Sequence, residues 1–284
     1  MHIEPFFDER TSTLTYVVFD EATKEAAVID PVLDYEPAGG KLWTESVERV
    51  AHFIDGHGLK PGWVLETHVH ADHLSGSQWL KKRYGAKVAV SERITEVQAA
   101  FAPVFGLDGF VADGHPFDQL LADGQLLRIG GLTLEARATP GHTPACMSFV
   151  VGDAVFTGDA LFLDDVGVGR CDFPKGSADA LYDSVTRRIF TLPDATRIFA
   201  GHDYPPPGRG WKASTTVGQA KAANVQLKSS NTKEEFVARR TARDRTLTPP
   251  RLLYPSLQVN MIAGQLPEPR ANGRRYLCTP IAGL

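Results

Sequence analysis

Short apolar runs separated by polar turns dominate the first two thirds of the chain. Residues 14–19 and 26–31 are two such runs, and the polar segment 20–24 between them predicts a β-hairpin. Apolar positions at helical spacing predict a helix over residues 43–56. The apolar run 63–67 that follows predicts a strand. The N-terminal part is therefore expected to build a sheet with a helix against it.

The same alternation continues downstream with more strands than helices. Further helices are expected near residues 74–84 and over residues 177–191. Further strands are expected at residues 86–90, 126–129, 132–138, 147–151, 154–157 and 198–200. Residues 101–118 are rich in glycine, proline, aspartate and phenylalanine and predict a loop. A strand-rich half followed by a mixed half favours a layered α/β sandwich over a parallel βαβ array.

The composition changes after residue 204, where three consecutive prolines and a glycine break regular structure. Thr232 and Glu235 have the spacing of a capping box, which predicts a charged helix ending at about Arg245. We expect one domain over residues 1–284, with an insertion or extension at about 205–245 and a C-terminal tail at about 264–284.

The amino-acid composition limits which classes of partner and which cellular compartment are expected. The chain of 284 residues is 43% hydrophobic and 23% charged, as is ordinary for a globular protein, and its net charge of −4 argues against nucleic acid or an anionic membrane surface as a partner. Three widely spaced cysteines without a CxxC motif favour a reducing compartment. The N-terminal residues lack the pattern of a secretory signal, and no uncharged apolar run approaches the roughly 18 residues of a membrane span. We therefore expect a cytoplasmic protein.

Ligand-type side chains are crowded directly after the predicted strand 63–67. Three histidines and an aspartate fall within six residues there, namely His68, His70, Asp72 and His73. In an extended segment His68 and His70 point to the same side. Neutral imidazoles and carboxylates are the usual nitrogen and oxygen ligands of zinc and iron. This segment predicts a metal enzyme.

Three later strand-to-loop junctions each carry one more possible ligand. His142 follows the predicted strand 132–138, Asp159 follows 154–157, and His202 follows 198–200. Each residue alone is ordinary, since such a histidine can be a turn residue and such an aspartate can cap a helix. Their recurrence at strand ends, together with the histidine-rich segment, predicts one shared metal centre.

The sequence resembles the metallo-β-lactamase superfamily in its HxHxDH segment followed by single His, Asp and His residues. The resemblance covers about residues 10–205 and implies a four-layer αββα sandwich with the metal at one edge of the sheets. In dinuclear members the matching residues would bind two metals. The first metal would be held by His68, His70 and His142, and the second by Asp72, His73 and His202, with Asp159 bridging them.

A second motif resembles one branch of that superfamily, the persulfide dioxygenases. Residues 167–173 are similar to the Gly-Arg-Thr-Asp-Phe motif of that branch, with Cys171 where the family has threonine. The run from His202 to Tyr204 also matches, and Pro250 to Leu252 is similar to the family's Asn-Pro-Arg-Leu. The segment 205–245 resembles that of some bacterial members.

The resemblance to persulfide dioxygenases implies one Fe(II) per chain, bound by His68, His142 and Asp159. His70, Asp72, His73 and His202 would then surround that site, or form a second one, because the sequence contains every ligand for it. The implied substrates are glutathione persulfide and dioxygen, and the implied products are sulfite and glutathione. The candidates for hydrogen bonding at the iron are Asp172 and His202, and the candidates for holding the substrate are Arg170, Tyr204 and Arg251. The alternatives are a structural ion pair for Asp172, a turn histidine for His202 and a surface arginine for Arg251.

Two other functions remain open at this stage. A glyoxalase II-type thioester hydrolase would use the same seven ligand positions for two zinc ions or mixed metals, with a metal-bound hydroxide as nucleophile. A metal- or persulfide-binding module without turnover is the other alternative. The sequence does not fix the oligomeric state, and a homodimer stays open beside a monomer. Cys171 is expected to be a buried packing residue rather than a nucleophile.

Overall fold

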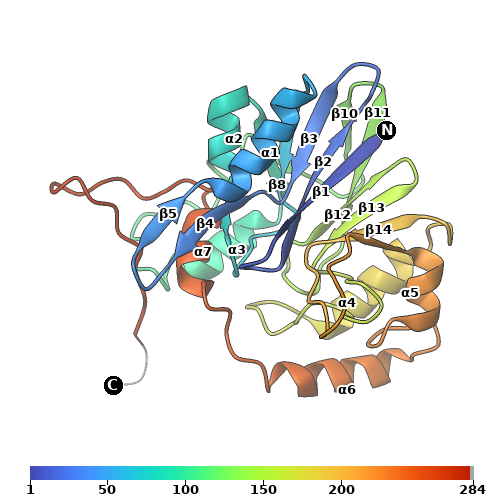
Figure 1. Ribbon diagram of the computed structural model, residues 1–284. Helices are drawn as coiled ribbons and strands as arrows, with labels where there is room; N and C mark the ends of the chain where they lie inside the picture. Colours follow the sequence, from blue (N-terminus) through green and yellow to red (C-terminus); the bar gives the residue numbers. More distant parts are fainter. Residues whose placement is uncertain (282–284) are drawn as a thin grey trace.

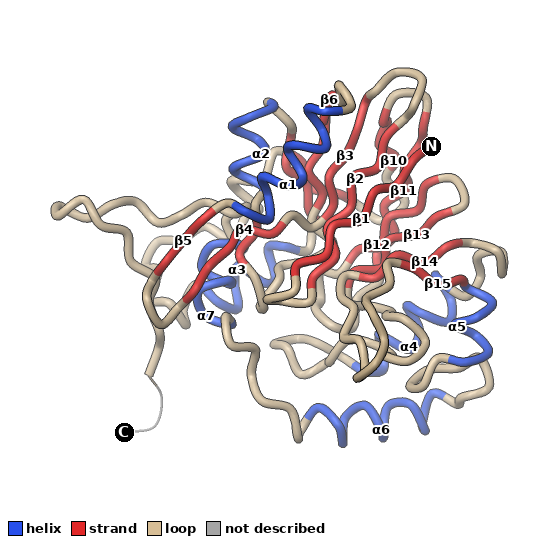
Figure 2. Tube along the Cα trace, in the orientation of Figure 1, coloured by secondary structure: helices blue, strands red, loops and turns tan. Residues whose placement is uncertain are grey.

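Two six-stranded β-sheets face each other in the computed structural model, which describes residues 1–281 (Figures 1 and 2). The first sheet has the order β1-β2-β3-β6-β8-β9, formed by β1 (His2–Asp8), β2 (Thr13–Phe19), β3 (Glu25–Ile29), β6 (Lys60–Leu65), β8 (Lys87–Ser91) and β9 (Gln119–Leu121). The second has the order β10-β11-β12-β13-β14-β15, formed by β10 (Leu126–Ile129), β11 (Leu132–Ala138), β12 (Met147–Val151), β13 (Ala154–Gly158), β14 (Arg197–Ala200) and β15 (Ser214–Thr216).

The main core lies between the two sheets. Side chains that alternate along the strands meet there, among them Tyr16 of β2 and Phe149 and Phe156 of the second sheet, all nearly inaccessible to solvent. Tyr16 makes edge-on contacts with Phe156 and Phe199, and its hydroxyl donates to the carbonyl of Ala200. These contacts tie the two sheets together close to the end of β14.

Helices cover the outer face of each sheet (Figure 1). On the first sheet lie α1 (Glu45–Gly56) and α2 (Ser77–Tyr84). On the second lie α4 (Ala178–Ser184), its π-helical continuation η1 (Val185–Ile189) and α5 (Val217–Ala223), and α6 (Lys233–Asp244) packs against α4. Helices α3 (Ile94–Phe101) and α7 (Leu253–Asn260) pack against the segment around Val69. The predicted αββα sandwich is confirmed.

Most of the predicted elements are present. The hairpin β2–β3 and the pairs β10–β11 and β12–β13 form as antiparallel ladders, and Thr232 and Glu235 make a complete capping box at α6. The helix predicted over 74–84 is wrong at its start. Leu74 and Ser75 form β7, which pairs with β4 (Val32–Glu36) in a small sheet completed by β5 (Lys41–Trp43), and the helix begins at Ser77.

Strand β1 was missed because Pro5 interrupts its pattern. Proline is tolerated there since β1 is the edge strand of its sheet. Among residues 1–281, no helix is both long enough and apolar enough to cross a bilayer.

Candidate metal centre

Strand ends from both sheets deliver the ligand-type side chains to one edge of the sandwich. The segment after β6 carries His68, His70, Asp72 and His73, while His142, Asp159 and His202 follow β11, β13 and β14. Strands β13 and β14 are parallel neighbours, so Asp159 and His202 leave the second sheet at the same edge. The seven residues predicted from the sequence therefore converge, although they span more than 130 positions of the chain.

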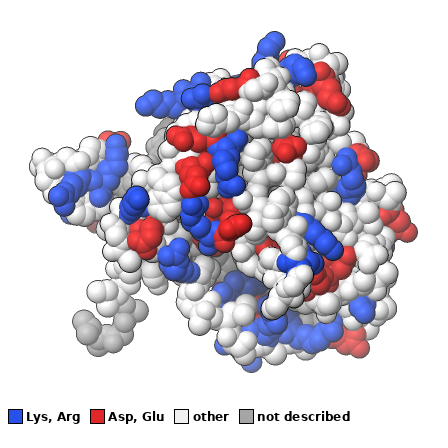
Figure 3. Space-filling view, viewed as in Figure 1, with Lys and Arg blue, Asp and Glu red and all other residues white. Residues whose placement is uncertain are grey.

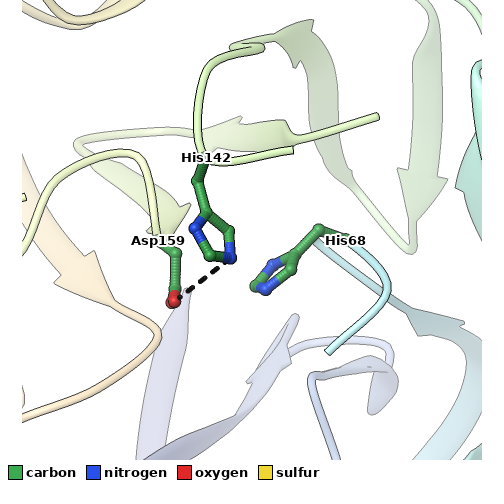
Figure 4. A group of neighbouring side chains, drawn as sticks. All are labelled: His68, His142 and Asp159. Carbon is green, nitrogen blue, oxygen red and sulfur yellow. Dashed lines mark ion pairs between the residues drawn. The ribbon is translucent and has the colours of Figure 1, made fainter. Parts of the chain in front are cut away.

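Three of them form a first cluster, consisting of His68, His142 and Asp159 (Figure 4). One ligand atom from each lies within 4.8 Å of the other two, and all three residues are buried. The Nε2 atom of His142 is 3.7 Å from Oδ2 of Asp159. Two imidazoles and one carboxylate are the same set of residue types as the 2-His-1-carboxylate ligands of non-haem iron sites.

A second cluster lies beside the first and contains His70, Asp72, His73 and His202. The first three of these residues offer ligand atoms within 4.8 Å of one another. The Nε2 atom of His202 lies 3.2 Å from Oδ2 of Asp72 and 3.5 Å from Oδ1 of Asp159. Asp159 thus presents one oxygen to each cluster, which is the position of a bridging carboxylate.

Within residues 1–281, buried side-chain nitrogen and oxygen atoms without hydrogen-bond partners gather at both clusters. They include His68 Nε2, His70 Nδ1, Asp72 Oδ2, His73 Nε2, Asp159 Oδ1 and His202 Nε2. A buried polar atom left unsatisfied costs about 1–3 kcal/mol, so a convergent set of them is unfavourable unless a cation is bound. The chemistry of these donors fits a divalent metal such as iron or zinc.

Hydrogen bonds from the Nδ1 atoms orient the two histidines of the first cluster. Thr67 donates its hydroxyl hydrogen to Asp30, so its oxygen accepts from Nδ1 of His68 at 3.0 Å. The Nδ1 atom of His142 donates to the carbonyl of Arg170 at 2.6 Å. Both histidines therefore present the lone pair of Nε2 to the centre of the cluster.

Burial keeps two of these imidazoles, those of His68 and His73, in the neutral form that binds metals. Burial, reinforced by the other histidines, holds the pKa of His68 well below its usual value, and burial lowers the pKa of His73 to about 4. His70 differs. Burial opposes the charged form of His70. Two carboxylates face its Nε2 atom, that of Asp30 at 3.0 Å and that of Glu66 at 3.6 Å. Their negative charge outweighs the effect of burial and raises the pKa of His70 to about 10.

Asp30 and Glu66 lie against the second cluster, and the sequence analysis did not single them out. Both are buried, and together with His70 they form a third group of closely spaced ligand-type atoms. Asp30 also accepts from the backbone N–H of Thr67 at 2.7 Å. Asp30 stands directly after β3, so the strand-end position that identified the other residues could have identified it as well.

A cavity of about 510 Å³ opens above the first cluster. Its floor includes Asp72, His142 and Asp159, and its walls come from the loop 167–173, from α6 and from residues 247–252. Five arginines line it, namely Arg10, Arg170, Arg240, Arg243 and Arg251. Lys and Arg side chains gather over α6 in the lower part of Figure 3. The cavity suits a small anionic substrate.

Of the predicted substrate-binding residues, Tyr204 has a direct place in the cavity. Its ring stacks on that of His202, with centroids 5.5 Å apart, and it lines the cavity wall. Tyr204 is 48% exposed, and an ordinary phenol is uncharged at neutral pH. The hydroxyl therefore stays protonated and can donate a hydrogen bond toward the cavity.

Arg170 also lines the cavity, but its guanidinium is fully engaged. Its Nε and one terminal nitrogen each donate to Asp172 at 2.6 Å, and the other terminal nitrogen donates to the carbonyl of Thr248 at 2.8 Å. Asp172 lies in this fork and is not among the residues that line the cavity. Arg251 lines the cavity as well, is largely exposed, and has Glu36 at 3.7 Å.

Cys171 is buried, as expected. Burial raises its pKa far above the usual value, which makes it a packing residue rather than a nucleophile.

Comparison with known proteins agrees with this fold and site. Residues 9–202 match the metallo-beta-lactamase superfamily. A probable metallo-hydrolase of Burkholderia pseudomallei is 46% identical over the whole length of both chains. Glyoxylase B2 of Dictyostelium discoideum is 43% identical, over 98% of this chain and 96% of its own.

Two further similarities concern persulfide dioxygenase relatives. The human mitochondrial persulfide dioxygenase ETHE1 is 36% identical over 237 residues, which cover 83% of this chain and 78% of the human one. The crystal structure of ETHE1 from Myxococcus xanthus superposes with a TM-score of 0.75 at 35% identity, covering 93% of this chain and all of that one. Relatives named for hydrolysis and for persulfide oxidation are thus both present.

Proposed function

The chain belongs to the metallo-beta-lactamase superfamily, and from that premise we propose that it is a persulfide dioxygenase holding one Fe(II) at His68, His142 and Asp159. The proposed reaction converts glutathione persulfide, dioxygen and water into glutathione and sulfite. Both oxygen atoms of dioxygen go to the terminal sulfur, which is oxidised. Water then cleaves the sulfur–sulfur bond, and the glutathione sulfur leaves as the thiol.

The main support for the proposal is that the loop 167–173 is hydrogen-bonded to two residues of the first cluster. The backbone N–H of Gly169 donates to the carbonyl of Asp159 at 3.0 Å, and the carbonyl of Arg170 accepts from His142. A Cβ atom on residue 169 would lie 2.2 Å from that Asp159 oxygen, so only glycine fits there. The loop that resembles the persulfide dioxygenase motif therefore holds two of the three proposed iron ligands.

Bound iron would supply open coordination positions for a persulfide sulfur and for dioxygen. The chain supplies the surroundings of these positions. The hydroxyl of Tyr204 would donate a hydrogen bond to a bound substrate, and stacking on His202 orients its ring. Phe162 packs edge-on against both rings and keeps this side of the cavity apolar. The fork between Arg170 and Asp172 keeps the loop 167–173 in its conformation.

A glyoxalase II-type thioester hydrolase with two metals is the second candidate. The observation in its favour is the second cluster, where His70, Asp72, His73 and His202 each have a buried side-chain atom without a hydrogen-bond partner among residues 1–281. Glyoxylase B2 also matches over almost the whole chain. In that case Asp159 would bridge the two metals.

Activity assays on the anaerobically purified protein separate the two candidates. We expect dioxygen uptake that depends on glutathione persulfide, with one sulfite formed per dioxygen consumed, and no hydrolysis of S-lactoylglutathione. Hydrolysis of S-lactoylglutathione without any persulfide-dependent dioxygen uptake would overturn the dioxygenase proposal and favour the hydrolase.

A further inference from the structure

Five arginines line the cavity above the first cluster, but three of them pair closely with acidic side chains and a fourth, Arg251, has Glu36 at 3.7 Å. Arg10 donates to Asp34 at 3.1 Å and also pairs with Glu45. Arg170 is held in the fork of Asp172. These guanidiniums are neutralised and bridge parts of the fold, so a substrate carboxylate would have to displace a protein carboxylate to bind them.

Arg240 of α6 is the third arginine with an acidic partner. It is buried, pairs with Asp244 one turn later, and donates to the side-chain oxygen of Gln226 at 2.7 Å. Its role is to anchor the helix rather than to meet a ligand.

Arg243 of α6 differs from all the others. It lines the same cavity and is exposed, and within residues 1–281 its side chain has no ion pair and no hydrogen bond. Arg251, on the segment leading into α7, has only the 3.7 Å contact with Glu36. An arginine without a partner on a cavity wall keeps its planar fork of donors available for a carboxylate.

The backbone at Arg243 is held close to the loop behind the first cluster. Asp244, the next residue, accepts from the backbone N–H of Cys171 at 2.9 Å, inside the loop that holds Asp159 and His142. Arg240 approaches the carbonyl of Val168 in the same loop at 3.4 Å. The helix is therefore tied directly to the loop behind the first cluster, and Arg243 stands one residue from that attachment.

We infer that Arg243 is a specificity-determining residue that binds a carboxylate of the thiol substrate, with Arg251 as a weaker second site. The inference deepens the proposed function and rests on its assumption of a glutathione-type substrate. Glutathione carries two carboxylates at the ends of a flexible peptide, remote from its sulfur. With the sulfur at the metal, those carboxylates lie toward the cavity walls, where α6 contributes the unpaired cation.

Binding of an unreactive analogue tests this without any turnover. The probe is S-methylglutathione, with its dimethyl ester as the analogue whose carboxylates are masked, titrated calorimetrically into the iron-loaded protein under nitrogen. We expect Arg243→Gln to weaken the binding of S-methylglutathione about tenfold, the effect of losing one charge-assisted contact. The ester should bind wild type and Arg243→Gln equally, because it has no carboxylate for Arg243 to recognise.

Arg245→Gln is the matched control. It removes the same charge two residues further on, from an exposed side chain that does not line the cavity. We expect its affinity for S-methylglutathione to stay within about twofold of wild type. Unchanged iron content and melting temperature in both variants would show that the fold and the metal site are intact.

Several results would overturn the inference. Equal binding of S-methylglutathione by wild type and Arg243→Gln is one, and an equal loss in Arg245→Gln is another, because it would indicate long-range charge instead of contact. No binding of S-methylglutathione to wild type is a third. These outcomes are distinct from failure of the proposed function, which is judged by persulfide-dependent dioxygen uptake. If the protein shows no such uptake but its binding of S-methylglutathione still depends on Arg243, the proposed dioxygenase activity is wrong and the inference about Arg243 stands.

Discussion

The two ligand clusters share one edge of the sandwich but differ in what lies behind them. The first cluster is held by the loop 167–173, through the contacts of Gly169 and Arg170 with Asp159 and His142. The second rests on the buried carboxylates Asp30 and Glu66, which face Nε2 of His70. Both clusters consist of histidine and aspartate side chains, so residue type alone does not distinguish them. The residues that hydrogen-bond to these side chains do distinguish them, because such contacts set the orientation and charge of a ligand.

This difference gives the two clusters different parts in the proposed chemistry. The loop behind the first cluster also reaches the cavity wall and α6, so that cluster is connected to the substrate-binding region. The carboxylates behind the second cluster are buried within the fold, away from the cavity. We therefore assign the reactive metal to the first cluster and a supporting part to the second.

The largest expected effect comes from removing the residue that both clusters share. Asp159→Ala should abolish iron binding and lower persulfide-dependent dioxygen uptake by more than about 100-fold, since loss of a direct ligand exceeds the usual 10- to 100-fold cost of losing a supporting contact. Metal analysis and oxygen-electrode assays check this. Asp108→Ala, which removes an exposed carboxylate from a loop, is the control and should retain iron. Iron retained in Asp159→Ala would refute the ligand assignment.

Breaking the ion pair between Arg170 and Asp172 should have the next largest effect on iron binding. Arg170→Gln and Asp172→Asn each remove one half of the fork that braces the loop 167–173, and each should lower iron affinity about tenfold. If the pair acts as one unit, the double variant should be no worse than either single variant. Additive losses would show that Asp172 has a role of its own at the iron, as the sequence resemblance implies.

His73→Ala tests the second cluster and should have a smaller effect. We expect one iron per chain to remain, with activity reduced by no more than about tenfold, because His73 would support the site without binding the metal. Iron content and dioxygen uptake measured on the same sample check this. Complete loss of iron would place His73 among the ligands and remove the proposed difference between the clusters.

The smallest expected effect is the chemical modification of the buried cysteines Cys146 and Cys171. Burial raises the pKa of Cys146 to about 12 and that of Cys171 further still, so both thiols stay protonated and protected at pH 8. Iodoacetamide at that pH should therefore modify only Cys278, which is exposed. Mass spectrometry of the intact protein should show a single adduct. Rapid modification of Cys171 would mean that the loop 167–173 opens readily and cannot hold the cluster firmly.

Much of this arrangement could be predicted from the sequence, because its signals are local. Strand ends are marked by a change from apolar to polar residues, and His68, His142, Asp159 and His202 all stand at such changes. The capping box of α6 was predictable for the same reason, since both of its residues lie within four positions.

Other features depend on contacts between distant segments and had no local signal. The engagement of Arg170 was not predictable in full because one of its terminal nitrogens donates to the carbonyl of Thr248, 78 positions away in the chain. Arg243 lies in a charged helix where most arginines are solvated, and its place on the cavity wall follows only from the docking of Asp244 onto Cys171, 73 positions away in the chain. The start of α2 was misjudged because β7 forms only by pairing with the distant β4.

Metal content after anaerobic purification tests the central claim most directly, because the two candidate functions need different metals in different numbers. Protein expressed with both iron and zinc available, purified under nitrogen and analysed by inductively coupled plasma mass spectrometry, should contain about one iron per chain. Two zinc ions per chain and no iron would contradict the assignment of a single iron to His68, His142 and Asp159.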